Sequence, residues 1–141
     1  MTAAYIDTSI LLAAAGEGEA EASRRVVAAV GDGRLEGVIS AEVLQELLHM
    51  ASWRQSRAQG LLLVDIAGKL FPHARPVGAA TVARAAELLR TTPRLGTRIA
   101  IHAAAMAEAG VRDVVSLDPE FGLVSGIRRL DPADAVAAYR I

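Results

Sequence analysis

Short apolar runs alternate along the chain with longer segments of helical periodicity. The apolar runs at residues 3–6, 37–39, 114–117 and 127–130 have the length of buried strands. Between them, apolar residues recur every three or four positions, as in helices that cover a sheet. Strands that alternate with helices indicate a parallel sheet with helices on both faces. The pattern therefore predicts an α/β fold.

The same periodicity locates the helices. They are predicted at residues 10–13, 19–30, 41–52, 55–69, 79–90, 95–109 and 132–139. Thr8 or Ser9 can cap the first of them, and Ser40 can cap the third. Residues 72–77 contain two prolines and form either an edge strand or an extended connector. The expected inner stripe of helix 79–90 is Val82, Ala85, Leu88 and Leu89.

Length and composition narrow the class of protein. A chain of 141 residues is most simply one domain with a core of its own. It is 52% apolar but only 4% aromatic, which favours closely packed helices on a sheet over a β-sandwich. There is no cysteine, so disulfide, zinc-thiolate and thiol-nucleophile chemistry are excluded. A reducing compartment fits this composition, and we expect the cytoplasm.

Targeting signals and net charge add little to the prediction of function. No basic region precedes an apolar stretch at the start, so no signal peptide is expected, and no apolar run is long enough to span a membrane. The formal net charge is −1. Any attraction to nucleic acid would therefore have to come from a local patch.

Three carboxylates are placed where α/β proteins bind ligands. Asp7 and Asp118 each follow an apolar strand, and Glu46 lies on the border of the apolar face of its helix. In a parallel sheet, the carboxyl ends of the strands line the ligand crevice. Carboxylates gathered there repel one another, and hard divalent cations prefer oxygen ligands. The arrangement predicts a divalent-metal site, with phosphodiester chemistry as its leading use.

Each carboxylate also has an ordinary structural interpretation, and position alone does not decide between the two. Asp7 could simply cap the helix that follows it. Asp118 precedes Pro119, and Asp-Pro is a common turn signal. Glu46, considered alone, is expected to form a surface salt bridge with Arg24, Arg25 or Arg54.

Five short segments, taken together, carry a resemblance to a known family. They are Tyr5–Ser9, Val43–Leu47, Ile101–Ala105, Val115–Phe121 and Gly126–Leu130. Each segment is weakly specific, but their order and their spread over essentially the whole chain resemble the PIN-domain family. The similarity is greatest to the small VapC-type toxins of bacterial toxin–antitoxin pairs.

This resemblance implies a fold and an activity. The expected fold is a single PIN-like domain over residues 1–141, a three-layer α/β/α sandwich with a central, mostly parallel sheet. The expected activity is that of an endoribonuclease that depends on Mg²⁺ or Mn²⁺, with Asp7, Glu46 and Asp118 as metal ligands and catalytic residues. Expected partners are an RNA substrate, a VapB-like antitoxin and a second copy of the chain. The alternative is a non-catalytic PIN-fold protein that acts through its dimer and antitoxin interfaces.

One position departs from the family pattern. Such proteins usually carry another aspartate at the start of the late helix, and that aspartate falls on Ile99. Ile99 is either a core residue, in one stripe with Ala103 and Met106, or an inactivating change in the pocket. In both cases a ligand is missing, and the expected result is weak binding of a single metal ion and slow or absent RNA cleavage.

Other residues are secondary candidates for the pocket. The resemblance places Ser116 where a small hydroxyl residue often lies near the metal, and Thr8 adjoins Asp7. His102 could contact a phosphate or a carboxylate, although a packed helix histidine is the safer interpretation. Arg94 and Arg98 could rim the pocket and hold RNA phosphates, because arginine presents a planar fork to phosphate oxygens.

The stretch from Arg54 to Lys69 is unusually apolar for a single helix. It contains Leu61, Leu62, Leu63, Val64 and Ile66. An exposed part of this surface would mark a site where a partner binds. The resemblance suggests two occupants, a second copy of the chain or the antitoxin.

Overall fold

A computed structural model describes residues 2–141 and contains one four-stranded sheet within that range. The strand order is β2-β1-β3-β4, and every neighbouring pair is parallel. The strands are β1 (Ala3–Ile6), β2 (Glu36–Val38), β3 (Asp113–Val115) and β4 (Arg128–Leu130). The predicted parallel sheet is confirmed, with each strand within about two residues of its expected place.

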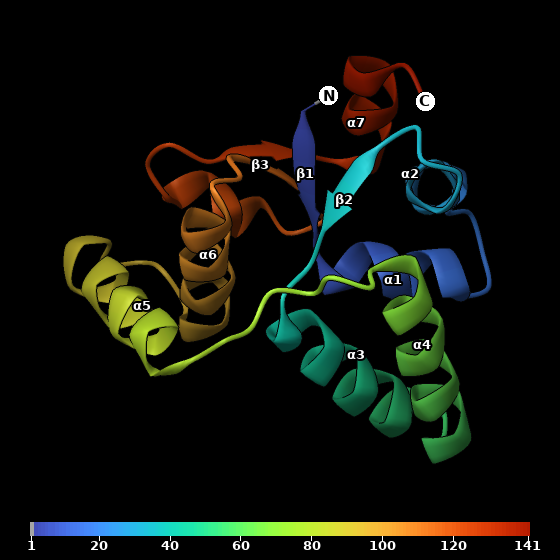
Figure 1. Cartoon of the computed structure of the whole chain (residues 1–141), viewed down its shortest axis with the longest axis horizontal. Helices are drawn as coiled ribbons and strands as arrows, with labels where there is room; N and C mark the ends of the chain where they lie inside the picture. The colour runs from blue at the N-terminus through green and yellow to red at the C-terminus, as the bar shows by residue number, and fades with distance from the viewer. Residues whose placement is uncertain (1) are drawn as a thin grey trace.

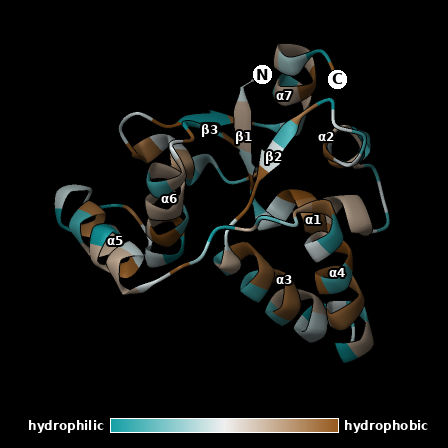
Figure 2. Ribbon diagram, in the orientation of Figure 1, coloured by the Kyte–Doolittle hydropathy of each residue, from teal (hydrophilic) through white to brown (hydrophobic). Residues whose placement is uncertain are grey.

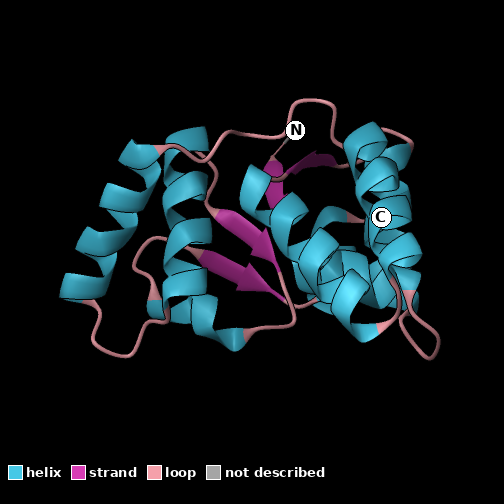
Figure 3. Cartoon of the chain, turned by 90° about the horizontal axis from the view of Figure 1, so that it is seen from below, coloured by secondary structure: helices cyan, strands magenta, loops and turns pink. Residues whose placement is uncertain are grey.

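Helices cover both faces of this sheet (Figures 1 and 3). α5 and α6 lie beside one face, and α1, α2 and α7 lie beside the other, which gives the predicted three-layer α/β/α fold. The helices are α1 (Thr8–Ala15), α2 (Glu21–Gly31), α3 (Ala41–Arg54), α4 (Arg57–Leu70), α5 (Ala79–Thr91), α6 (Thr97–Ala109), α7 (Pro132–Tyr139) and the short 3₁₀ helix η1 (Pro119–Leu123).

The two central strands, β1 and β3, lie in the middle of the core. Tyr5, Ile6, Val114 and Val115 have no solvent-exposed surface. The pairing of β1 with β3 places Ile6 opposite Val115, and the Asp7 amide continues the ladder by donating to the Val115 carbonyl at 3.1 Å. The residues that follow these two strands are therefore neighbours. This register fixes the position of the site.

Two details of the fold, the segment at residues 72–77 and the buried face of α5, were not fixed by the sequence pattern. Residues 72–77 form a connector that touches the sheet region through a single parallel bridge between Ser40 and Arg75. The predicted inner stripe of α5 is wrong at Val82, which is 51% exposed. Thr81 is buried instead, because its hydroxyl accepts a hydrogen bond from the Gly78 amide and donates to Glu108 on α6.

Helices α3 and α4 pack on each other and expose apolar side chains. Figure 2 shows hydrophobic segments along α1, α3 and α4. Trp53 is 82% exposed. Leu61, Leu62 and Ile66 of α4 are also exposed. Across residues 2–141, no helix combines the length and apolar character that a membrane span requires.

Candidate active site

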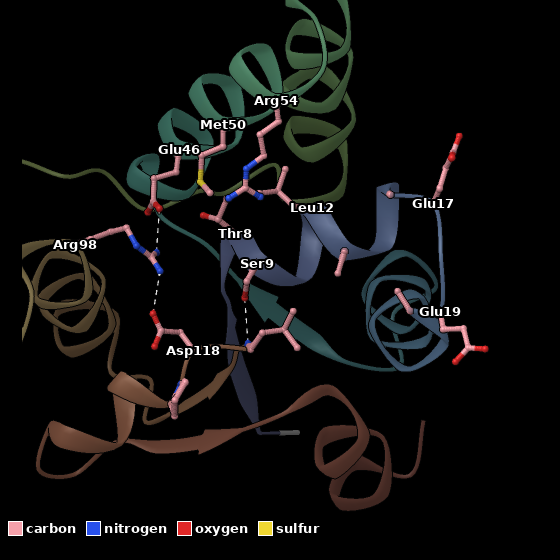
Figure 4. Close-up of a pocket in the computed structure, with 15 residues that line it drawn as sticks. Thr8, Ser9, Leu12, Glu17, Glu19, Glu46, Met50, Arg54, Arg98 and Asp118 are labelled. Carbon is pink, nitrogen blue, oxygen red and sulfur yellow. Dashed lines mark hydrogen bonds and ion pairs between the residues drawn. The ribbon is translucent and has the colours of Figure 1, made fainter.

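Four structural elements converge on one cleft at the carboxyl edge of the sheet (Figure 4). Its volume is about 670 Å³. The residues that line it include Thr8, Ser9, Glu46, Arg54, Arg98 and Asp118. Glu46 comes from α3 and Arg98 from α6, while Asp118 follows β3. Asp7 lies directly beneath, at the end of β1, and is fully buried. The convergence of Asp7, Glu46 and Asp118 expected from the sequence is therefore present.

Asp7 is oriented by two hydroxyl groups. Ser9 and Ser116 each donate to its Oδ2 atom at 2.7 Å, a short distance that is typical of hydrogen bonds to a carboxylate. Its Oδ1 atom is buried and has no hydrogen-bond partner within the described chain. Asp7 occupies the N-cap position of α1, yet its side chain makes no capping hydrogen bond. Its role is therefore not that of a helix cap.

Ser116 also connects Asp7 to Asp118. Its hydroxyl accepts from the Asp118 amide at 3.0 Å, and the Leu117 amide donates to Ser9 at 3.1 Å. The Oδ1 atom of Asp118 accepts from the Glu120 amide and so starts η1, as the turn interpretation predicted. Its other oxygen faces Arg98. Asp118 thus fulfils both interpretations, because one carboxylate oxygen supports the turn and the other faces the cleft.

Glu46 is held by a buried chain of side chains. Its Oε1 atom contacts Nε2 of His102, and Nδ1 of His102 lies 2.8 Å from the Tyr5 hydroxyl. The Tyr5 hydroxyl in turn lies 2.7 Å from Ser40 Oγ. His102 is completely buried, as the packed interpretation expected, but it also contacts a carboxylate. Ser40 occupies the N-cap position of α3 without capping it, because its hydroxyl is used in this chain.

The direction of these hydrogen bonds follows from the groups at the two ends of the chain, the Glu46 carboxylate and the Ser40 hydroxyl. An ionised carboxylate only accepts, so the bond to Glu46 places the proton on Nε2 of His102. In the neutral imidazole, Nδ1 then accepts from Tyr5, and the Tyr5 oxygen accepts from Ser40. Burial, opposed by the hydrogen bond from Ser40, raises the pKa of the Tyr5 phenol above its usual range. Tyr5 therefore stays protonated and can act as the donor.

Arg98 lies among the three carboxylates. Its Nη1 atom is 3.0 Å from Glu46 Oε2 and 3.7 Å from Asp7 Oδ1, and its Nη2 atom is 3.3 Å from Asp118 Oδ2. Figure 4 shows its guanidinium between Glu46 and Asp118. Partial burial opposes the charge of Arg98, but Glu46, Asp7 and Asp118 together raise its pKa. Arg98 is therefore held as the counter-cation of the acidic cluster.

These contacts correct one sequence-based expectation and extend another. Glu46 was expected to pair with Arg24, Arg25 or Arg54, but its partner is Arg98, which is 52 residues away in the sequence. Arg98 was expected to rim the pocket. It does line the cleft, and its guanidinium there faces Glu46, Asp7 and Asp118.

Ile99 does not lie in the cleft. Its side chain is 1% exposed and belongs to the apolar core with Ala103 and Met106, as the core interpretation expected. On α6, the residue that lines the cleft is Arg98. A one-residue step turns a helix by about 100°. The family pattern puts an aspartate at the start of this helix, but the α6 side chain that faces the cleft is that of the neighbouring Arg98.

The remaining candidates from the sequence are Thr8 and Arg94. Thr8 lines the cleft, and its buried hydroxyl oxygen has no hydrogen-bond partner among residues 2–141. Arg94 is exposed in the loop before α6. Sequence reasoning missed Ser9 and Arg54 as cleft residues. The Asp-Thr-Ser triplet was a signal for Ser9, but nothing local pointed to Arg54, which reaches the cleft from the last turn of α3.

The residues present fit a hard divalent cation in their chemistry. All three acidic side chains offer carboxylate oxygens, and the unpartnered Oδ1 of buried Asp7 calls for a cation or donor. As they stand, however, the side chains of residues 2–141 include no group of three or more potential ligands spaced to hold a metal. The guanidinium of Arg98 lies among the oxygens that would bind the ion.

Comparison with known proteins identifies relatives. Residues 4–127 match the PIN domain family. The chain is 32% identical over 133 residues to Ribonuclease VapC7 of Mycobacterium tuberculosis (strain ATCC 25618 / H37Rv), with 90% of each protein covered. This match extends over nearly all of both chains.

Solved structures share the fold. One is VapBC2 from Rickettsia felis bound to a DNA fragment from its promoter, with a TM-score of 0.72, 16% identity and coverage of 92% of this chain and 98% of that chain. Another is the Mycobacterium tuberculosis toxin VapC20, which cleaves the sarcin–ricin loop, with a TM-score of 0.67, 21% identity and coverage of 84% and 92%. Sequence and fold thus agree, and the chain belongs to the PIN domain family, as a relative of the VapC-type ribonucleases.

Proposed function

We propose that this chain is a VapC-type endoribonuclease toxin that requires Mg²⁺ or Mn²⁺. The observation that carries the proposal is that Glu46 and Asp118 line one cleft while Asp7, buried beside it with one oxygen unpartnered, shares Arg98 with them. The relative with 32% identity over 90% of the chain is a ribonuclease, which supports RNA as the substrate class.

The roles of the side chains follow from their contacts. Asp7, Glu46 and Asp118 would hold the cation, which would supply activation of water and stabilisation of charge on the departing oxygen. Ser9 and Ser116 fix the Asp7 carboxylate, and His102 fixes that of Glu46. Hydrogen bonds of this kind keep ligands in a binding geometry. No nucleophilic side chain of the protein is needed.

Basic side chains near the cleft would hold the RNA backbone. Arg54 lines the cleft, and Arg94 is exposed in the loop that leads to α6, the helix that carries Arg98. With a net charge of −1, the chain depends on such local groups for attraction to phosphates. We propose Arg54 and Arg94 as phosphate contacts. Binding should then weaken as salt is raised, because phosphate contacts release counterions.

The antitoxin would bind along α4. Leu61, Leu62 and Ile66 are exposed there, and an apolar groove of about 220 Å³ runs beside Ile66 between α1, α2, α3 and α4. Two of the structural relatives are VapBC assemblies, from Rickettsia felis and Salmonella typhimurium. An amphipathic segment of a VapB-like antitoxin fits such a groove. The homodimer implied by the resemblance stays a prediction.

RNA cleavage by the purified chain tests the proposal. We expect slow cleavage in Mg²⁺ or Mn²⁺, none in EDTA, and a loss of at least about 100-fold in Asp7→Asn. Asp65→Asn is the matched control, because Asp65 is an exposed carboxylate on α4, away from the cleft. Cleavage that survives both EDTA and Asp7→Asn would contradict the proposal. Saturable antitoxin binding without any cleavage would support the non-catalytic alternative.

A further inference from the structure

Arg98 occupies the position that any other cation in this cluster would need. Its guanidinium lies within 3.7 Å of an oxygen from each of Glu46, Asp7 and Asp118. One of those oxygens, Asp7 Oδ1, is the atom without a hydrogen-bond partner. A planar guanidinium with several donors suits such a set of carboxylates better than a point charge does.

Asp7 is buried beside the same side chain. Asp7 has no exposed surface and does not line the cleft, whereas Arg98 and Glu46 do. The Arg98 side chain is itself 41% exposed, so it can turn outward into solvent. Among the described residues 2–141, no three ligands are close enough together for a metal while Arg98 lies among them. Solvent therefore meets Arg98 before it meets the deepest carboxylate.

We propose that Arg98 is a built-in counter-cation that competes with the divalent metal and must leave the cluster when the metal binds. This inference rests on the proposed metal site of the nuclease. Like charges gathered without a cation repel one another, so Arg98 stabilises the metal-free protein. The same contacts lower the apparent metal affinity, because the metal must displace them before it binds. Arg98 thus sets the metal concentration at which the site becomes loaded.

Substitution of Arg98 should raise the metal affinity and lower the stability of the metal-free protein. The two effects can therefore be measured separately. Arg98→Gln removes the charge and keeps a polar side chain of moderate length. Arg98→Lys keeps a charge without the planar fork, and folding of each variant is checked by circular dichroism. Arg84→Gln is the matched control, because Arg84 is an exposed arginine on α5 for which the described residues provide no ion pair. Each full-length variant is titrated with MnCl₂ by calorimetry, and its thermal unfolding is followed in EDTA.

The proposal predicts an order of affinities. Arg98→Gln should bind Mn²⁺ at least about tenfold more tightly than the wild type, with Arg98→Lys between them and Arg84→Gln unchanged. In EDTA, Arg98→Gln should unfold about 2–4 °C lower than the wild type, because the carboxylates have lost their cation. A residue with a merely structural role would lower both the stability and the metal affinity.

Other outcomes overturn the proposal in distinguishable ways. If folded Arg98→Gln binds Mn²⁺ no more tightly than the wild type does, Arg98 does not compete with the metal, although the nuclease proposal stands. If neither protein binds Mn²⁺, the acidic cluster is not a metal site, and both proposals fail.

Discussion

The Tyr5 hydroxyl lies 2.8 Å from Nδ1 of His102, and both side chains are completely buried. His102 is the residue that holds Glu46 at the cleft. A phenol at the centre of the sheet is therefore connected, through one imidazole, to a nearly buried carboxylate that lines the cleft.

Tyr5→Phe should destabilise the protein by about 1–3 kcal/mol, because it leaves the Ser40 hydroxyl and His102 Nδ1 buried without a partner. Urea denaturation measures the change in the free energy of unfolding. Nitrogen NMR of His102 should show a proton on Nε2 in the wild type. Ser40→Ala removes only the outermost donor and should cost less than Tyr5→Phe. Equal stabilities of Tyr5→Phe and the wild type would show that the chain of hydrogen bonds contributes nothing.

Ser116→Ala should weaken metal binding without removing any ligand. The substitution leaves Asp7 Oδ2 with one hydroxyl donor in place of two and frees the Asp118 amide. Loss of such a supporting hydrogen bond typically lowers metal affinity about 10–100-fold. Calorimetric titration with Mn²⁺ measures the effect. Ser125→Ala, in an exposed loop position, should bind as the wild type does, and a similar loss in both variants would contradict a specific role for Ser116.

Gly60 and Gly68 lie on the same helix, α4, and alanine should have opposite effects at the two positions. A Cβ atom at Gly60 would lie 2.0 Å from Ser52 Oγ and 2.9 Å from the Leu48 carbonyl oxygen on α3. The backbone of α3 cannot yield easily, so Gly60→Ala should cost about 1–3 kcal/mol. A Cβ at Gly68 meets no atom within 4 Å, and Gly68→Ala should stabilise by up to about 1 kcal/mol through helix propensity. Thermal unfolding of the two variants compares them, and a shift in the same direction would refute the close-packing explanation.

At the opposite end of β3, Asp113 should make stability depend on acid pH. Arg128 donates two hydrogen bonds to it and Tyr139 a third, and its side chain is only 9% exposed. The hydrogen bonds from Arg128, opposed by burial and helped by Tyr139, lower the pKa of Asp113 below its usual value of 3.8. A lowered pKa in the folded state gives stability that is present above the unfolded value and lost as pH falls below it.

Asp113→Asn should therefore lower the free energy of unfolding at neutral pH by about 1–3 kcal/mol and flatten its decline below pH 3.8. Urea denaturation at several pH values measures both effects. Asp32→Asn is the control, because the Asp32–Arg34 pair is about half exposed on each side and should contribute little. An unchanged pH profile in Asp113→Asn would contradict the argument.

Local patterns were sufficient for the fold. The predicted helix at residues 132–139 coincides with α7, and the strand before Asp7 coincides with β1, because caps, prolines and apolar periodicity act over a few residues. The convergence of Asp7 and Asp118 also followed, since parallel strands end at one edge. The failure at Val82 has a tertiary cause: the Thr81–Glu108 hydrogen bond turns the buried face of α5 by one residue.

The sequence by itself determined the strand–helix alternation and the acidic residues at the carboxyl ends of the strands, because both depend on neighbours along the chain. Only the tertiary structure decided that Ile99 is core and that Arg98 faces the carboxylates. Arg98 is 52 residues from Glu46 and 20 from Asp118 in the sequence, and no local pattern encodes such distances. Electrostatic partners are chosen by proximity in space, and packing of α6 against the sheet and α3 creates that proximity.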